Sequence, residues 1–241
     1  MLHKTRGIVF KVTDYSESSV IVQVFTEKFG LQSYLVNGVK KPKAKVKLNM
    51  LQPLHLLEMI VYNRPNAGIQ RISELRPDPV FQTIPYDVIK SCLMLFLNEV
   101  LYKSVKQTFG DEYLFGFLFN AIEILDKTEE GLANFHLAFL LQLSRYLGFY
   151  PDRSNEAGAN YFDLYDGIFT KELPSHALIV HGVELEYLTK LLKAKFDALE
   201  EIKIPSTERK ALLESILKYY ELHLEGFSNI KSHLILEEVL S

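Results

Sequence analysis

Five lysines within eleven residues form the part of this 241-residue sequence that is best suited to binding chemistry. They lie between positions 37 and 47 and are Lys40, Lys41, Lys43, Lys45 and Lys47. Like charges placed so close together repel unless solvent or an acidic partner neutralises them, and the phosphates of nucleic acid are the commonest such partner. The run therefore predicts a loop that faces phosphates. A loop whose charge is only solvated is the alternative, because most charge runs have no bound partner.

Basic and aromatic residues alternate along the segment that precedes this cluster. Proteins that bind single-stranded nucleic acid use lysine or arginine for the phosphates and aromatic rings for the bases. The further residues that we expect to contact nucleic acid are Lys4, Arg6, Lys11, Lys28 and Tyr34. Tyr15 and Phe29 also lie near turns and are candidates for stacking, whereas Phe10 and Phe25 are expected to fill a core.

No group of residues typical of an active site or a metal site is found. The seven histidines are scattered, and His176 and His181 lie five positions apart, which does not place them on one helical face. Neither a phosphate-binding glycine loop nor a nucleophile motif occurs. The single cysteine, Cys92, lies in an apolar helical stretch, where a buried thiol is expected. We therefore expect no catalysis, no cofactor, no metal and no small-molecule substrate.

Formal charge is distributed unevenly along the chain. Residues 1–80 hold 12 Lys and Arg against 6 Asp and Glu, which leaves 15 against 24 for the remainder. The net charge of −3 thus combines a basic first third with an acidic remainder. This asymmetry indicates two parts with different partners. We expect two domains, spanning 1–80 and 81–241.

Alternation of apolar and polar residues predicts five short strands in the first part. These strands are expected at about 6–12, 19–26, 31–37, 54–62 and 68–75. A five-stranded barrel of this size, with its long connection after the third strand, is typical of an OB-fold, which binds oligonucleotides. An SH3-like barrel is the competing fold.

Helical spacing replaces the strand pattern after residue 80. Helices are expected at about 85–107, 111–126, 131–147, 183–200, 206–224 and 230–240. Gly148 is suited to end the third helix, and Asp166-Gly167 indicates a short hairpin within a loop region at about 149–174. The expected fold class is α+β multidomain, with an N-terminal OB-fold barrel followed by an all-helical C-terminal domain that carries this insertion.

Nothing in the sequence predicts a membrane span or a signal region. No apolar run reaches the roughly 18 residues that a membrane span needs, and the N-terminal residues lead directly into a strand pattern. We therefore expect a cytoplasmic protein without membrane contact.

In the order and spacing of its motifs, the chain resembles the RecO family of bacterial recombination mediators. The motifs that carry the likeness are Arg6-Gly7-Ile8-Val9, Tyr15-Ser16-Glu17-Ser18-Ser19, Phe25-Thr26-Glu27-Lys28-Phe29-Gly30, Gly38-Val39-Lys40-Lys41-Pro42-Lys43, Leu51-Gln52-Pro53-Leu54 and Leu147-Gly148-Phe149-Tyr150-Pro151. The likeness covers the first 80 residues and about 135–152. Elsewhere it is one of helical architecture.

The resemblance implies a non-catalytic, nucleoid-associated protein of DNA repair and recombination. Members of the family bind single- and double-stranded DNA and anneal complementary strands. They act with RecR to load RecA on DNA that is covered by single-stranded DNA-binding protein, SSB, in the RecF pathway. Carried over to this sequence, Lys40, Lys41 and Lys43 fall in the family's basic DNA-binding loop. Lys45 and Lys47 extend that loop, and Arg6 begins a basic barrel face.

Two segments of the second part bear on partners and metal. The run Gly226-Phe227-Ser228-Asn229-Ile230-Lys231-Ser232 resembles the family's last conserved segment, so Lys231 and Ser232 are expected to contact the acidic SSB tail. Many relatives carry a four-cysteine zinc site where residues 152–169 lie here, yet this stretch contains no cysteine. No zinc is therefore expected, and apolar side chains must support the hairpin instead. They are Tyr161, Phe162, Leu164, Tyr165, Ile168 and Phe169.

Two other functions remain open for a barrel of this size, because fold alone does not decide function. One is a non-catalytic adaptor whose barrel grips an acidic peptide or another domain. The other is RNA binding in the translation machinery.

Overall fold

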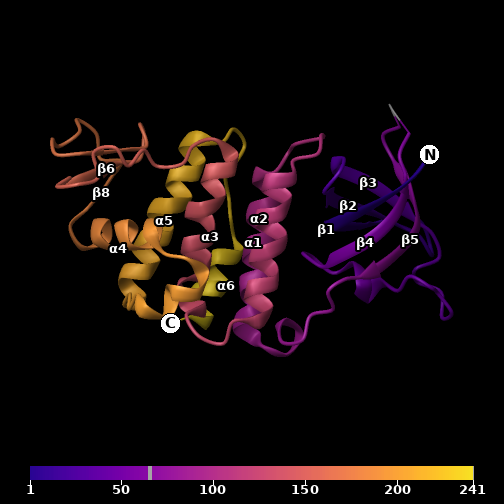
Figure 1. The fold of residues 1–241 in the computed structure, drawn as a ribbon. Coiled ribbons are helices and arrows are strands. Elements are labelled where there is room, and N and C mark those ends of the chain that lie inside the picture. The colour runs from indigo at the N-terminus through magenta and orange to yellow at the C-terminus, as the bar shows by residue number, and fades with distance from the viewer. Residues whose placement is uncertain (65–66, 241) are drawn as a thin grey trace. The chain divides into compact units, whose positions relative to one another are not determined.

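The computed structural model describes residues 1–64 and 67–240 (Figure 1). It divides into two compact units, and the division runs through the first α-helix. The first unit comprises Met1–Tyr86 and Met94–Asp126, and the second comprises Asp87–Leu93 and the chain from Lys127 onward. The unit that contains the barrel therefore also contains helical residues beyond position 80. The domain boundary near residue 80 stays a prediction.

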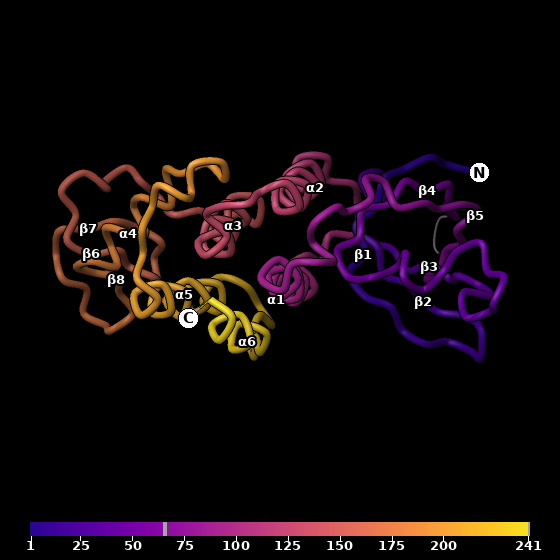
Figure 2. Tube along the Cα trace, turned by 90° about the horizontal axis from the view of Figure 1, so that it is seen from below, coloured from indigo at the N-terminus to yellow at the C-terminus, as the bar shows by residue number. Residues whose placement is uncertain are grey.

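Five strands form a closed barrel in the first unit (Figure 2). They are β1 (Leu2–Asp14), β2 (Val20–Thr26), β3 (Gly30–Val36), β4 (Leu56–Tyr62) and β5 (Gln70–Pro77). Their order is β1-β2-β3-β5-β4, and β1 pairs with both β2 and β4. Only the pairing of β3 with β5 is parallel among these described strands. The expected five-stranded barrel is confirmed, and its topology fits the OB-fold.

Alternating side chains from the strands fill the barrel interior, as the period of two requires. The buried members of this core are Val9, Val20, Val22, Val24, Tyr34, Val36, Val39, Leu51, Leu57, Met59 and Val61. Phe10 and Phe25 are also buried, but they stack on each other with centroids 5.9 Å apart, and Phe25 packs against Phe115 of a following helix. Both are buried, but the expectation that they belong to the barrel core is wrong: neither is a member of the barrel cluster, and Phe25 is covered from the outer face by the following helix.

Two helices follow the barrel. They are α1 (Val88–Ser104) and α2 (Glu112–Lys127), with the 3₁₀ helices η1 (Leu48–Leu51) and η2 (Ile84–Tyr86) before them. Asp126 near the end of α2 accepts hydrogen bonds from the N–H groups of Gln82, Thr83 and Ile84 at 2.8–2.9 Å. This carboxylate therefore ties the segment after the barrel to α2 within the first unit.

The second unit contains four further helices and a small sheet. The helices are α3 (Leu132–Leu147), α4 (Gly182–Lys193), α5 (Ser206–His223) and α6 (Ser232–Val239), with the 3₁₀ helix η3 (Phe196–Glu201) between α4 and α5. Gly148 ends α3 with a φ of 89°, as expected, because a left-handed residue there costs glycine little. The expected helix at 183–200 is shorter, since Ala194 is extended and the chain continues as η3.

The region expected to be all-helical also carries a three-stranded sheet of order β7-β6-β8. Its strands are β6 (Tyr161–Asp163), β7 (Ile168–Thr170) and β8 (Ile179–His181), and Figure 2 shows them beside α4. The expected hairpin is confirmed as β6 and β7. The third strand was missed because three residues are too few to show alternation. Among the described residues, no helix is both long and apolar enough to cross a membrane.

Candidate nucleic-acid interface

The lysine loop, residues 37–47, connects β3 to η1 and is fixed to the barrel by two valines. Val39 is 4% exposed and Val46 is half-buried, and both pack against the barrel core. Within the loop, the N–H of Lys41 donates to the carbonyl of Gly38 at 3.1 Å. The five lysines are all exposed. They therefore extend into solvent from a backbone that the barrel holds in place.

A groove of about 430 Å³ lies between the lysine loop and β5. Its cationic lining consists of Lys41, Lys43, Lys45 and Arg71. Arg71 is brought there by the parallel pairing of β5 with β3, in which it lies opposite Leu35. We did not expect Arg71 from the sequence. The strand pattern marks its position, but only the barrel closure shows that the lysine loop is its neighbour.

Lys40 differs from the other lysines of the loop. Its Nζ lies 2.8 Å from Oδ1 of Asp14, the last residue of β1. Within the described part of the chain, the other four have no ion-pair partner. The loop therefore presents four uncompensated positive charges beside that of Arg71, and such a concentration of charge attracts polyanions.

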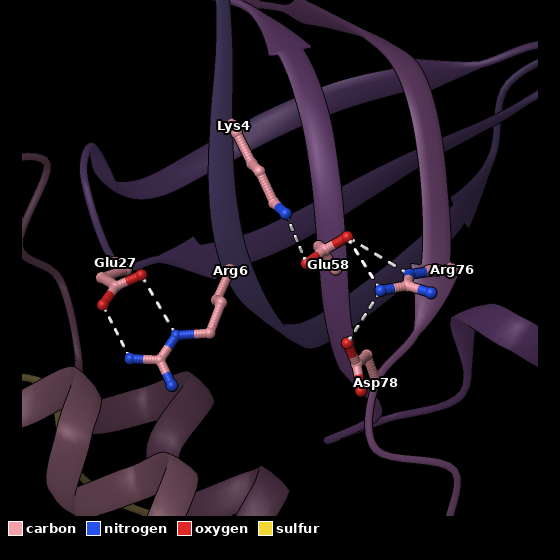
Figure 3. Close-up of polar contacts among 6 residues, drawn as sticks. All are labelled: Lys4, Arg6, Glu27, Glu58, Arg76 and Asp78. Carbon is pink, nitrogen blue, oxygen red and sulfur yellow. Dashed lines mark hydrogen bonds and ion pairs between the residues drawn. The ribbon is translucent and has the colours of Figure 1, made fainter.

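Most cations on the outer surface of β1 and its neighbours are paired with carboxylates (Figure 3). The Nζ of Lys4 lies 2.8 Å from Glu58, and a guanidinium nitrogen of Arg76 lies 3.1 Å from the same carboxylate. Arg76 also contacts Asp78 at 3.3 Å. The hydrogen bond from Lys4, followed by the charge of Arg76, lowers the pKa of Glu58. A phosphate at Lys4 would have to compete with Glu58 for its charge.

Arg6 is held more firmly than Lys4. Two of its nitrogens donate to the carboxylate of Glu27, at 2.7 and 3.1 Å, and this hydrogen bonding lowers the pKa of Glu27. Its guanidinium carbon also lies over two rings of α2, 4.7 Å from the centroid of Phe119 and 5.3 Å from that of Phe115. Arg6 therefore joins the barrel to α2 and already has a carboxylate partner, and its expected contact with DNA stays a prediction.

Lys11 and Lys28 remain accessible. The Nζ of Lys11 donates to the hydroxyl of Tyr102 on α1 at 3.1 Å and lies 4.8 Å from the centroid of that ring. Neither contact is with a carboxylate, so neither compensates the lysine charge. Lys28 is exposed in the turn between β2 and β3.

The aromatic candidates differ in their exposure. Tyr34 is 1% exposed and belongs to the barrel core, where burial raises the pKa of its hydroxyl. The expectation that Tyr34 contacts DNA is wrong, because a ring enclosed on all sides cannot stack on a base. Phe29 is half-buried against the same core and meets His3 edge-on. Tyr15, in contrast, is 61% exposed in the turn after β1.

Comparison with known proteins extends over the whole fold. The family model for the N-terminal part of recombination protein O matches residues 1–78, and the model for its C-terminal part matches residues 85–233. The chain belongs to the RecO family. It is 36% identical over 239 residues to DNA repair protein RecO of Azobacteroides pseudotrichonymphae and 38% identical over 240 residues to that of Bacteroides fragilis. In both cases 99% of each chain is covered. It is thus a DNA repair protein of the RecO family.

The RecO segment expected to contact a partner lies at the start of α6. Lys231 is the exposed residue that precedes the helix, and Ser232 is half-buried as its first residue. Both therefore lie where a chain enters a helix, at the surface of the second unit. Their role toward an acidic peptide stays a prediction.

The region for which the family resemblance raised the question of a zinc site is packed by aromatic rings. Phe162 of β6 lies 4.9 Å from Phe169 of β7 and 5.5 Å from Tyr219 of α5, measured between centroids. The hydroxyl of Tyr219 donates to the carbonyl of Phe149 at 2.5 Å. Among the residues that the structure describes, no three or more His, Cys, Asp or Glu side chains are grouped to hold a metal ion. The residues present do not fit a zinc site of the four-cysteine type.

Proposed function

We propose that this RecO family member binds single- and double-stranded DNA through the lysine loop and the groove beside β5. The observation that carries the proposal is the convergence of Lys41, Lys43, Lys45 and Arg71 on one groove, on a backbone fixed by Val39 and Val46. Rigid presentation matters because ordering a long side chain and its backbone on binding costs free energy. A loop already in place loses less of its binding free energy to ordering.

In this mode of binding the cations contact backbone phosphates, which are the same in every sequence, so little sequence preference is expected. Each phosphate neutralised on duplex DNA contributes about 0.9 to the slope of log K against log salt concentration, and about 0.7 on a single strand. The four lining cations therefore predict that the groove contributes a slope of at most about 3.6 on duplex DNA.

The test compares two double variants that remove the same formal charge. Lys41→Gln with Lys43→Gln removes two unpaired loop cations, whereas Lys4→Gln with Arg76→Gln removes two cations already paired with carboxylates. Binding of a labelled oligonucleotide is followed by fluorescence anisotropy at several salt concentrations. The loop variant should lose about 1.8 from the duplex slope, and the control should lose none. Equal losses in the two variants would rule out the groove as the specific site.

We further infer that the protein is a non-catalytic mediator that anneals complementary strands and helps to load RecA on SSB-coated DNA with RecR. Support comes from family membership and from the charge asymmetry, since an acidic second part is suited to partner contacts and not to DNA. Lys231 and Ser232 are the proposed contacts for the SSB tail. A labelled SSB tail peptide should bind the wild type more tightly than Lys231→Ala, and equal binding would remove Lys231 from that contact.

The same DNA titration distinguishes the proposed function from the alternative, an adaptor whose barrel binds an acidic peptide. An adaptor should show no salt-dependent binding of any oligonucleotide. The proposal also includes two domains, with limits at 1–80 and 81–241. It includes association of the protein with the nucleoid as well.

A further inference from the structure

The connection between α1 and α2, residues 105–111, packs closely against the turn between β2 and β3 and is hydrogen-bonded to the start of β3. The N–H of Leu31 donates to the carbonyl of Gln107 at 2.8 Å. Gly30 has a φ of 64°, and a Cβ there would lie 2.6 Å from the carbonyl oxygen of Gln107. A Cβ on Gly110 would similarly lie 2.6 Å from the carbonyl oxygen of Lys28. The two backbones therefore touch, and both glycines are needed for this approach.

This connection displays a large aromatic ring. Phe109 is 67% exposed, although its own backbone packs against Gly30. An exposed ring on a fixed backbone offers a flat apolar face, and little conformational entropy is lost when a planar partner covers it. Bases of single-stranded nucleic acid are planar partners of this kind.

Three lysines come from the segments around this connection. Lys28 is exposed in the turn whose backbone meets Gly110. The Nζ of Lys106 donates to the carbonyl of Tyr102 at 2.8 Å and lies 5.4 Å from its ring centroid, and Lys11 contacts the hydroxyl of the same ring. We name this set the aromatic strip: Lys11, Tyr102, Lys106, Phe109 and Lys28.

Nearby carboxylates do not cancel the charge of the strip. Glu27 is paired with Arg6. Asp111 and Glu112 lie where α2 begins, and the carboxylate of Asp111 accepts the N–H of Leu114 at 2.9 Å. The positive end of the helix dipole offsets such carboxylates.

We propose that the aromatic strip binds the unpaired bases and phosphates of a single strand, with Phe109 as the stacking ring. The proposal rests on the proposed function, and adds to it a site that separates single strands from duplex. In a duplex the faces of the bases are already covered by their neighbours, so the phosphates can reach the lysine loop while the bases cannot reach Phe109. A mediator that anneals strands needs such a site, because bases must be held unpaired before they meet a complement.

Tryptophan fluorescence tests the stacking directly, because the sequence contains no tryptophan. Phe109→Trp places one emitter in the strip, and Tyr86→Trp places one at another exposed aromatic position, 87% exposed in η2. An oligothymidylate should quench Phe109→Trp, whereas an abasic oligonucleotide of equal charge should not. Tyr86→Trp should respond to neither. If the emission of Phe109→Trp is unchanged while anisotropy shows that the oligothymidylate is bound, the proposal that the aromatic strip stacks on bases is wrong.

Affinity measurements separate failure of the strip from failure of the proposed function. Phe109→Ala should weaken single-strand binding roughly 5- to 150-fold, which corresponds to the loss of one stacked base, and should leave duplex binding and both salt slopes unchanged. Tyr86→Ala is the control and should change neither affinity. If Phe109→Ala binds both DNA forms like the wild type, the strip is wrong and the lysine loop still stands. If the wild type binds no DNA, the proposed function fails as well.

Discussion

Replacement of Arg6 with alanine distinguishes a cation that holds the fold from one that binds DNA. Arg6 makes a two-nitrogen contact with Glu27 and lies over the rings of Phe115 and Phe119. A solvent-screened pair contributes about 0.2–1 kcal/mol, and each exposed cation–π contact contributes about 0.5–1 kcal/mol. These contributions share one side chain and are not fully additive, so Arg6→Ala should lower the free energy of unfolding by about 1–2 kcal/mol.

The assay is urea unfolding of the full chain followed by circular dichroism, with Lys4→Ala as the matched control. Lys4 has the same formal charge and lies on the same strand, but it contacts only Glu58 and leaves Arg76 on that carboxylate. Lys4→Ala should therefore shift the unfolding midpoint much less than Arg6→Ala. High salt should reduce the effect of Arg6→Ala only in part, because ring contacts are screened less than the ion pair.

The pH dependence of this effect has a definite sign. Because Arg6 lowers the pKa of Glu27 below its ordinary 4.5, the pair stabilises the fold above that value and is lost as the pH falls through the lowered pKa. The difference between wild type and Arg6→Ala should therefore shrink below pH 4.5. The reasoning is refuted if Arg6→Ala leaves the unfolding midpoint unchanged and instead lowers the salt slope of DNA binding by about 0.9.

Three further predictions concern acid stability and metal. Asp126→Asn should destabilise the first unit by about 1–3 kcal/mol, because three backbone N–H groups lose a charged acceptor. Burial raises the pKa of Asp126, but hydrogen bonds from Ile84, Gln82 and Thr83 outweigh this effect and lower the pKa. The stability advantage of the wild type over Asp126→Asn should therefore vanish in an acid titration below pH 3.8. Burial, with a smaller effect of Arg209, lowers the pKa of His136 to about 3, so only the unfolded chain takes up this proton between pH 6.5 and about 3. The wild type should lose stability as the pH falls below 6.5, and His136→Gln should lose less between pH 7.5 and 5 in urea titrations. Protein purified without a histidine tag should contain no stoichiometric zinc by elemental analysis, and a chelator should leave its melting temperature unchanged, since residues 152–169 contain no cysteine.

The barrel could be predicted from the sequence because its strands have one face in a core, which enforces a period of two. The side on which a residue is buried was harder to assign. Phe10 and Phe25 are as apolar as interior residues, but Phe25 packs against Phe115 of α2 and Phe10 stacks on Phe25. Burial by a helix that follows about 90 residues later leaves no trace in the local pattern of a strand. For the same reason, three-residue strands such as β8 gain their stability from neighbours and not from their own sequence.

The candidate site was predictable only in part. The lysine loop is continuous in sequence, so its charge is visible at once. The pairing of Arg6 and Lys4 with carboxylates depends on Glu27 in the turn after β2 and on Glu58 of β4, which the local sequence of β1 does not reveal. Tyr34 was misjudged because its place near the end of a strand resembles a turn, whereas its side chain points into the barrel. Arg71 was missed because pairing between β3 and β5 spans a long connection.

The carboxylates of the first 80 residues also determine where the excess positive charge lies. Asp14, Glu27, Glu58 and Asp78 pair with Lys40, Arg6, Lys4 and Arg76. Three of these four cations lie outside the lysine loop, so pairing neutralises the surface around β1 and β5 more than it neutralises the loop. A field that is concentrated on one groove, instead of being spread over the barrel, orients a strand along that groove. If the groove binds DNA as proposed, the acids of the barrel restrict where phosphates can bind.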